Sequence, residues 1–201
     1  LSSLGKTNRW GLFPSFGIAW HAQEESFLRE LDWLEQSKFR ASIGQSGQAP
    51  GGTAPYVGTY TAVGKYIQNQ AVAPSSMQLN NLKWESSTEY DIGVDLGFLD
   101  NKLTMTFDYY YKYTKDLLQT GVSIPSSTGY NDQGNTIAYF NSGEISNQGW
   151  EYRIDYEVFK NKDWRVAANF NINRNINTIQ ALPENMVATS YTLGNGRYAQ
   201  K

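Results

Sequence analysis

The stretch Trp84–Tyr113, WESSTEYDIGVDLGFLDNKLTMTFDYYYKY, holds two segments in which apolar and polar residues alternate. From Glu85 to Phe98 the even positions are apolar or hydroxylic, and the odd positions are mostly carboxylates and glycines. The alternation resumes at Leu103, now with the apolar residues on odd positions. A period of two is that of a β-strand, whose successive side chains point to opposite faces. Because Leu99–Lys102 has the composition of a tight turn, the stretch predicts a β-hairpin.

The register of this hairpin follows from the same alternation. Placing Phe98 opposite Leu103 sets every apolar residue of one arm beside an apolar residue of the other, and it sets Glu89 opposite Lys112. A shift by one residue would destroy both matches. Each arm has about 13 residues, against roughly 5–6 for an ordinary strand and roughly 9–11 for a transmembrane strand. The hairpin is long enough to cross a membrane.

Composition restricts the function classes. The 201 residues include no cysteine, which excludes disulfides, thiolate metal sites and cysteine nucleophiles from this chain. The net charge is −2 and the chain contains no run of basic residues, so the sequence gives no indication of nucleic-acid binding. No apolar run approaches the roughly 18 residues of a membrane helix, but barrel strands alternate and give no such run. The chain starts at Leu1 without an initiator methionine, and we expect it to be an internal piece of a longer protein.

The rest of the chain repeats the strand pattern. Four further strands are predicted, at Trp10–Trp20, Lys38–Gly44, Gly149–Phe159 and Trp164–Ile176. In the last pair we expect Val158 opposite Trp164. Capping and apolar spacing predict a short helix at Ser26–Leu34. Long loops are expected at about 45–83, 118–147 and 178–201. Six antiparallel strands and one short helix therefore make an all-β chain.

Long and short connections alternate in this prediction. Outer-membrane barrels have short periplasmic turns and long external loops, and they carry aromatic girdles near both ends of the strands. We therefore expect the loops to be extracellular, the turns to be periplasmic, and one set of side chains to face lipid, namely Tyr90, Ile92, Val94, Leu96, Ile154, Tyr156 and Val158. The alternative is a soluble antiparallel β-sandwich, such as a carbohydrate-binding module, with the aromatic faces as its core.

Several ordered motifs resemble one family. They are WGLFPS at Trp10–Ser15, FRASIGQSG at Phe39–Gly47, LKWE at Leu82–Glu85 and NQGWE at Asn147–Glu151. These stretches resemble SusC/RagA-type TonB-linked outer-membrane proteins, which are TonB-dependent transporters. The matching motifs extend over nearly the whole chain.

The resemblance implies a location and partners. Residues 1–201 would be part of the C-terminal half of a large, about 22-stranded barrel, a multi-pass protein of the bacterial outer membrane. The short helix would be periplasmic, and the plug and remaining strands would lie outside this segment. The resemblance also implies import of glycans or peptides, a SusD-like surface lipoprotein as lid, the TonB complex acting through the plug, and surrounding outer-membrane lipid.

We predict no catalytic residue, cofactor or metal site, and hence no enzyme. His21 is the single histidine and lies at a predicted strand end. Glu85, Glu89, Asp91 and Asp95 form a row of carboxylates, which raises a carbohydrate-active enzyme as a third hypothesis. Strand alternation alone produces such a polar row, without catalysis.

Aromatic side chains of the long loops are the candidate contacts for substrate or lid. They could stack on sugar rings or pack against a partner protein. The alternative is that they pack the loops onto each other. The candidates are Tyr56, Tyr60, Tyr66, Tyr130, Tyr139 and Phe140.

Overall fold

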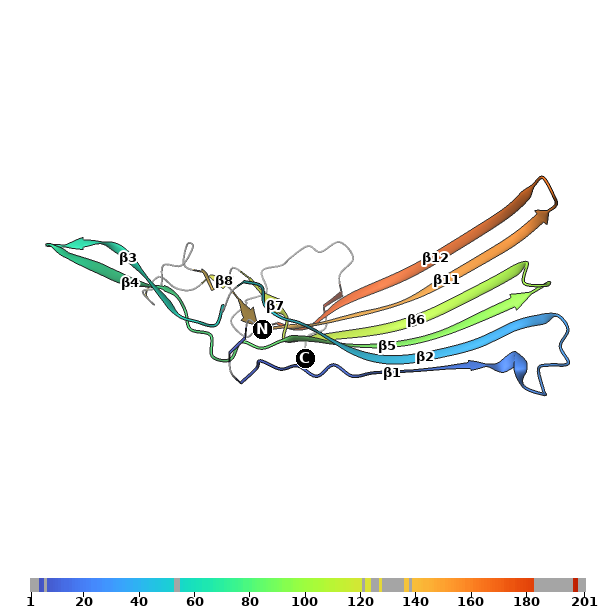
Figure 1. Ribbon diagram of the computed structural model, residues 1–201, viewed down its shortest axis with the longest axis horizontal. Helices are drawn as coiled ribbons and strands as arrows, with labels where there is room; N and C mark the ends of the chain where they lie inside the picture. The colour runs from blue at the N-terminus through green and yellow to red at the C-terminus, as the bar shows by residue number, and fades with distance from the viewer. Residues whose placement is uncertain are drawn as a thin grey trace.

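A computed structural model describes residues 4–5, 7–52, 55–120, 122–123, 127, 136–137, 139–182 and 197–198. The main unit is one curved sheet, whose strands lie side by side in a single layer (Figure 1). The strands, in their order across the sheet, are β1 (Ser15–His21), β2 (Leu34–Gln48), β5 (Glu85–Phe98), β6 (Leu103–Lys115), β11 (Glu144–Lys160), β12 (Arg165–Ala181) and β13 (Arg197–Tyr198). All neighbours are antiparallel except β12 and β13, which are parallel. The sheet is not closed into a barrel.

The central hairpin has the predicted register. Phe98 pairs with Leu103 and Glu89 pairs with Lys112. The turn between the strands is closed by a hydrogen bond from the Lys102 amide to the Leu99 carbonyl at 3.1 Å. Leu99, Asp100 and Asn101 all have positive φ, near 56°. The turn and the alternation therefore agree, as expected from the sequence.

The predicted register of the second long hairpin, β11–β12, is wrong. Lys160 pairs with Arg165, and a bulge at Val158 leaves Phe159 opposite Val166. The Asn161 carboxamide oxygen accepts hydrogen bonds from the backbone amides of the two residues before Arg165, at 2.9 and 2.6 Å. This side-chain bond starts the turn at Asn161, one residue later than expected.

The predicted helix is misplaced. A 3-10 helix, η1 (Ala22–Glu24), follows β1. Ser26–Trp33 runs through turns instead of an α-helix, and β2 begins at Leu34. Ring contacts hold this segment against the sheet: Phe27 lies 6.5 Å from Trp20, and Trp33 stacks on Phe98 at 5.9 Å. These contacts compete with continued helix formation. The part of the chain that the structure describes contains no helix that could span a membrane.

The region expected to be a long irregular loop contains a hairpin. It consists of β3 (Thr59–Tyr66) and β4 (Asn69–Ser76), and it projects beyond the large sheet (Figure 1). Its strands contain Gly, Pro and Gln, and their pairing has two irregularities of register. For these reasons the sequence of this hairpin shows no clear alternation of apolar and polar residues. Two smaller pairs are β7 (Leu118–Gln119) with β10 (Phe140–Asn141), and β8 (Val122–Ser123) with β9 (Thr136–Ile137).

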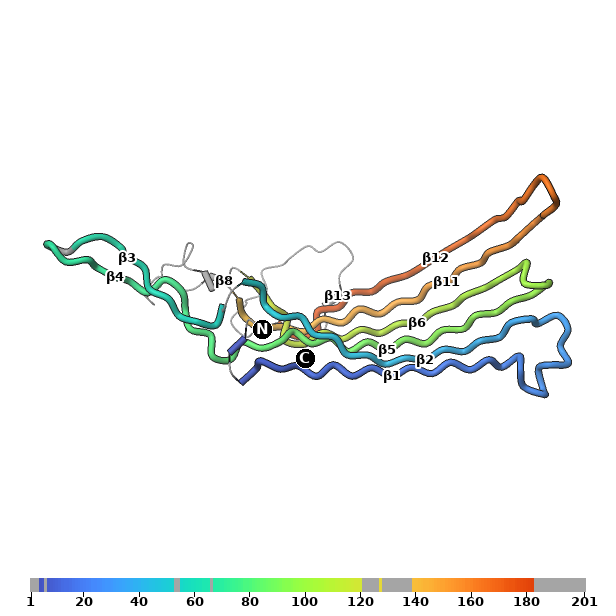
Figure 2. Tube along the Cα trace, in the orientation of Figure 1, coloured from blue at the N-terminus to red at the C-terminus, as the bar shows by residue number. Residues whose placement is uncertain are grey.

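The strand ends differ from the prediction mainly near the long connections. β2 extends to Gln48, β11 begins at Glu144 and β12 extends to Ala181. The short connections gather at one end of the sheet, and the long ones lie at the other end (Figure 2). We call these the short-turn end and the loop end. The strands continue beyond their apolar central parts because backbone pairing does not need apolar side chains.

The described residues have almost no conventional core. The buried hydrophobic residues are Leu4, Ala22 and Leu82, and none of them lies in the large sheet. A β-sandwich needs two sheets packed around a shared apolar core. The described residues form one seven-stranded layer and three two-stranded pairs, so they do not have the architecture of the sandwich alternative.

Candidate functional site

The large sheet has an apolar face that is continuous across six strands. Its rows follow the register, and one of them runs through Trp20, Phe39, Val94, Phe107, Tyr152 and Ile172. Many of its side chains are exposed: Phe16 is 68% exposed, and Ile18 and Ile92 are each 61% exposed. Monomeric soluble proteins rarely expose so large an apolar surface, which marks a membrane or protein contact.

Ring contacts on this face lie near the two strand ends. Trp20 stacks on Phe39 at 5.7 Å at the short-turn end, and Tyr90 lies 6.4 Å from Tyr111 nearer the loop end. Further rings, among them Phe107, Tyr109 and Tyr152, lie between these two contacts, so aromatic side chains are spread along the strands of this face.

The opposite, polar face is organised around Arg40. Its Nε lies 2.9 Å from Oδ2 of Asp95, and its Nη2 lies 2.8 Å from Oδ1 of Asp108. One guanidinium therefore joins β2, β5 and β6, and all three side chains are half-buried. A side chain at Gly93 would collide with the Asp108 carboxylate and the Arg40 guanidinium, so glycine there leaves room for the network. This role of Arg40 was not predicted from the sequence.

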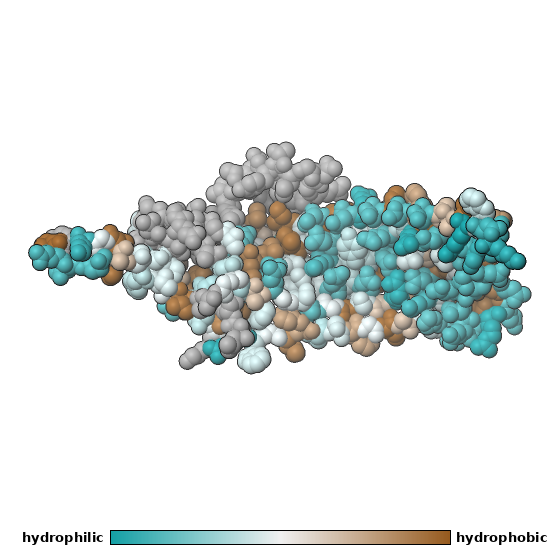
Figure 3. Space-filling model, turned by 45° about the horizontal axis from the view of Figure 1, so that its top comes forward, coloured by the Kyte–Doolittle hydropathy of each residue, from teal (hydrophilic) through white to brown (hydrophobic). Residues whose placement is uncertain are grey.

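Other charges on the polar face also form pairs. Lys112 lies 4.0 Å from Glu89, as the predicted register requires, and Arg165 lies 2.7 Å from Glu157. Two carboxylates of the predicted acidic row, Glu89 and Asp95, thus each have a cation partner. Figure 3 shows a mainly hydrophilic surface over the short-turn end. The polar face therefore carries several ion pairs and is not simply a row of free acids.

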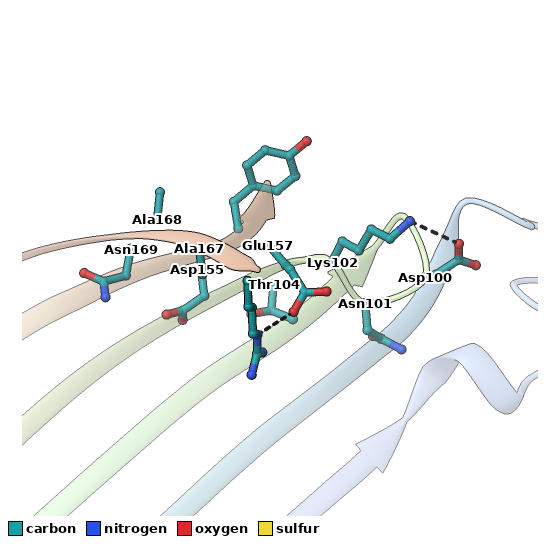
Figure 4. Close-up of a pocket in the computed structure, with 11 residues that line it drawn as sticks. Asp100, Asn101, Lys102, Thr104, Asp155, Glu157, Ala167, Ala168 and Asn169 are labelled. Carbon is teal, nitrogen blue, oxygen red and sulfur yellow. Dashed lines mark hydrogen bonds and ion pairs between the residues drawn. The ribbon is translucent and has the colours of Figure 1, made fainter. Parts of the chain in front are cut away.

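A shallow pocket of about 280 Å³ lies on the polar face at the short-turn end. In Figure 4 Asp155 and Asn169 point to its side of the sheet, and Ala168 points to the other. The Glu157–Arg165 ion pair belongs to its lining. The pocket offers hydrogen bonds and paired charges. Among the described residues, no group of three or more His, Cys, Asp or Glu is placed to hold a metal ion.

The loop end is held by a set of contacts that we call the loop-end clasp, made by Asn8, Lys83, Trp84, Asp116 and Asn141. The Asn141 carboxamide donates to the carbonyls of Lys83 and Asp116, both at 2.9 Å, and accepts from the Lys83 amide at 2.8 Å. The Lys83 ammonium lies 2.9 Å from the Asp116 carboxylate. The Trp84 indole donates to the Asn8 carbonyl at 2.9 Å. The clasp joins three segments that are distant in the sequence, and no sequence pattern predicts it.

Three of the predicted aromatic contacts are half-buried. Tyr56 lies over Gly5, and its carbonyl accepts a hydrogen bond from the Leu79 amide at 3.1 Å. The hydroxyl of Tyr139 lies beside Gly51, which belongs to a different long connection. Phe140 lies in β10. The first two side chains therefore contact segments that are distant from them in the sequence.

The other three candidates have different surroundings. Tyr60 is 75% exposed on the projecting β3–β4 hairpin. Tyr66 ends β3 and pairs with Asn69. Tyr130 lies outside the described residues. The described candidates are spread over the loop end and do not form one compact site.

Comparisons with known proteins agree with this architecture. Residues 2–201 match the family described as TonB dependent receptor-like, beta-barrel. TonB-dependent receptor P3 of Formosa agariphila is 35% identical over 187 residues, which cover 91% of this chain and 18% of that protein. TonB-dependent receptor SusC of Bacteroides thetaiotaomicron is 34% identical over 189 residues, which cover 90% of this chain and 18% of SusC. The chain thus spans less than a fifth of these relatives.

Solved structures give the same result. The RagAB peptide importer in its "closed-closed" state superimposes with a TM-score of 0.80 and 26% identity, covering 96% of this chain and 20% of that one. Its "open-open" state gives the same values. The ordered motifs, the alternating sheet and the match over nearly the whole length agree. The chain therefore belongs to the TonB-dependent receptor-like β-barrel family as a SusC/RagA-type member, which places it in the bacterial outer membrane.

Proposed function

We propose that this chain is a wall segment of a transporter that imports glycans or other nutrient oligomers across the outer membrane. The observation that supports this most directly is the pair of opposite faces on one sheet. The apolar face suits lipid, and the polar face with its ion pairs suits a hydrated interior. Further strands of the same protein would complete the barrel wall at the open edges.

The proposal assigns the two ends of the sheet to opposite sides of the membrane. The loop end is extracellular and the short-turn end, with η1, is periplasmic, following the usual asymmetry of outer-membrane barrels. A peptide tag inserted between Ala49 and Gly58 in the full-length protein should be labelled on intact cells. A tag at Asn101 should be labelled only after permeabilisation. The reverse pattern would invert the orientation.

Import against a gradient needs an energy source, and a closed, plugged barrel has none in its own membrane. The TonB route, which the family resemblance supplies, would deliver that energy through the plug. The long connections are then the part of this segment that can meet external substrate or a SusD-like lipoprotein lid before the plug moves. Relatives named SusC and RagAB support a partnership of this kind.

The β3–β4 hairpin offers a clean test of capture. It pairs only with itself among the described strands, so its removal leaves the large sheet intact. A Cβ atom at Gly58 would lie 3.3 Å from the Cβ of Gln78, so the hairpin begins and ends at adjacent points. Deleting residues 59–77 and joining the ends through two glycines should also keep the hydrogen bond between Tyr56 and Leu79. Long surface loops tolerate such changes.

The measurement is substrate-limited growth or uptake of the full-length deletion variant, alongside its abundance at the cell surface. We expect weaker capture of substrate or of the lid lipoprotein at normal abundance. A matched control replaces the hairpin residues Thr61 and Thr59 by serine and should change neither quantity. Normal uptake at normal abundance would show that the hairpin takes no part in capture. Lost abundance would show that it is structural.

A further inference from the structure

One strand of the sheet carries an uninterrupted row of asparagines. Residues 169–177 read NFNINRNIN, so every second position of β12 is asparagine. We call Asn169, Asn171, Asn173, Asn175 and Asn177 the asparagine ladder. Alternate residues of a strand share one face, so the amides follow each other about 6.8 Å apart along the strand.

The register places the ladder on the polar face. Asn169 pairs with Asp155, Asn171 with Arg153, and Asn173 with Glu151. Figure 4 shows Asn169 and Asp155 on the same side of the sheet. The ladder therefore faces the barrel interior in the transporter proposed above, on which this inference rests.

The ladder amides are free of side-chain hydrogen bonds within the part of the chain that the structure describes. Asparagines of the connections behave differently. Asn8 donates to the Leu82 carbonyl at 3.0 Å, and Asn80 accepts from Gln78 at 2.8 Å. Asn141 makes three of the contacts of the loop-end clasp. These three side chains serve local structure, whereas the ladder keeps its donors and acceptors available.

The surroundings of the ladder are hollowed and largely charge-compensated. A second pocket of about 240 Å³ is lined by Arg153, Asn169, Phe170 and Asn171, and it shares Asn169 with the pocket at the short-turn end. Arg153 pairs with Asp155 at 2.6 Å. Glu151 has no ion pair among the described residues, and its negative charge disfavours an anionic ligand.

We infer that the asparagine ladder is a hydrogen-bonding track for an uncharged, hydroxyl-rich oligomer, a neutral oligosaccharide, on its way along the barrel wall. Each carboxamide offers two N–H donors and a carbonyl acceptor, which match hydroxyl groups that both donate and accept. Even spacing over five positions suits a repeating ligand more than a single small molecule. Among the described residues Arg153 and Asp155 satisfy each other, which leaves the neutral amides and Glu151 as the main free hydrogen-bonding groups on this part of the face.

The loop end gives an independent argument for an uncharged ligand. Between Gln45 and Leu82, Lys65 is the one charged residue, although the segment contains tyrosines, glutamines and asparagines. Tyr60, in this segment, is widely exposed and has a ring suited to stacking on a sugar face. This connection, with its single charge, and the uncharged ladder therefore offer a ligand similar polar chemistry.

The test uses the full-length protein in its native outer membrane. The ladder variant is Asn171→Ala with Asn173→Ala, and the matched control is Ser42→Ala with Thr106→Ala, which removes two polar side chains from the same face on β2 and β6. The probes are neutral oligosaccharides released from starch, xylan, mannan and agarose, and a tryptic peptide pool from casein. Uptake is measured against probe concentration and normalised to surface abundance.

We expect uptake of a neutral oligosaccharide to need about tenfold more probe for half-saturation in the ladder variant, from the loss of about two net hydrogen bonds. The control variant should match the parent protein. Unchanged half-saturation in the ladder variant would overturn the track. Loss of peptide uptake alone would overturn the ligand class. Parent protein that imports neither probe would overturn the proposed transport function itself.

A variant that keeps side-chain size covers the case of poor folding. Asn171→Asp with Asn173→Asp retains the shape of the ladder but removes its amide donors and adds negative charge. We expect normal abundance and the same direction of change in half-saturation. If both ladder variants lost abundance while the control did not, the ladder would be part of the wall's structure and the track would be overturned.

Discussion

The two faces of the large sheet are built from the same strands but are held in opposite ways. On the polar face Arg40 joins Asp95 and Asp108, so the charged groups find partners within the sheet. On the apolar face Ile92 and Phe170 are 61% and 55% exposed, and no described layer covers them. Residues that are adjacent in the chain therefore require opposite environments, one polar and one apolar. The polar face is satisfied from within, whereas the apolar face needs an external apolar phase.

The largest effect is expected from a charge placed on the apolar face. Val94→Arg places a guanidinium near the middle of β5, where lipid is expected, and the cost should be about 2–4 kcal/mol at the bilayer midplane. Thr106→Arg, on the polar face of the neighbouring strand β6, is the control and should cost far less. The measurement is the urea midpoint for unfolding of the full-length protein in phospholipid vesicles. Equal losses at both positions would remove the lipid-facing assignment.

The division of residues between the two faces could largely be predicted from the sequence, because a period of two determines which residues share a face. The pairing of Phe98 with Leu103 followed from apolar matching on two arms of a single hairpin. The parity of β11 and β12 was also predictable, although their register was not. A bulge at Val158 and a side-chain bond at Asn161 shifted the pairing. Such local hydrogen bonds leave no trace in an apolar pattern.

The contacts at the loop end were less predictable. The loop-end clasp depends on one carboxamide, Asn141, meeting backbone groups of Lys83 and Asp116. Any asparagine in a polar segment could make such bonds, so sequence alone does not single one out. The Arg40 network was easier to predict, because opposite charges on the polar face of paired strands are expected to meet. Of the predicted aromatic contacts, exposure separates Tyr60 from the half-buried Tyr56 and Tyr139.

The next largest effect concerns the polar face. Arg40→Ala leaves the carboxylates of Asp95 and Asp108 without their shared cation, and a half-buried pair of this kind should cost about 1–2 kcal/mol after allowance for solvent screening. Adding Asp95→Asn and Asp108→Asn removes the two unpaired carboxylate charges, and this should recover part of the lost free energy of unfolding. The same urea midpoint checks both variants. Absence of any recovery would mean that packing of the arginine side chain matters more than its charge.

A smaller effect is expected at the glycine that makes room for this network. Gly93→Ala brings a methyl group against the Asp108 carboxylate and the Arg40 guanidinium, and the displacement should cost about 1 kcal/mol. Gly17→Ala is the matched control, because its added methyl group would meet the Ser42 Cβ at an ordinary 3.6 Å. Its effect should stay within about 0.5 kcal/mol. Equal destabilisation would show that strand flexibility matters here and not the space beside Arg40.

The smallest perturbation tests the comparison without changing stability. Val94 and Asp95 are adjacent in β5, and their side chains point to opposite faces because successive residues of a strand alternate. This chain has no cysteine, so a nitroxide label can be attached at either position of a full-length protein whose other accessible cysteines are replaced. Oxygen concentrates in the hydrocarbon region, whereas a water-soluble nickel chelate is excluded from it. We therefore expect the label at position 94 to relax with oxygen and the label at position 95 with the chelate. Equal responses at both positions would mean that the two faces meet the same solvent, and the lipid-facing assignment would fail even though the sheet itself remained intact.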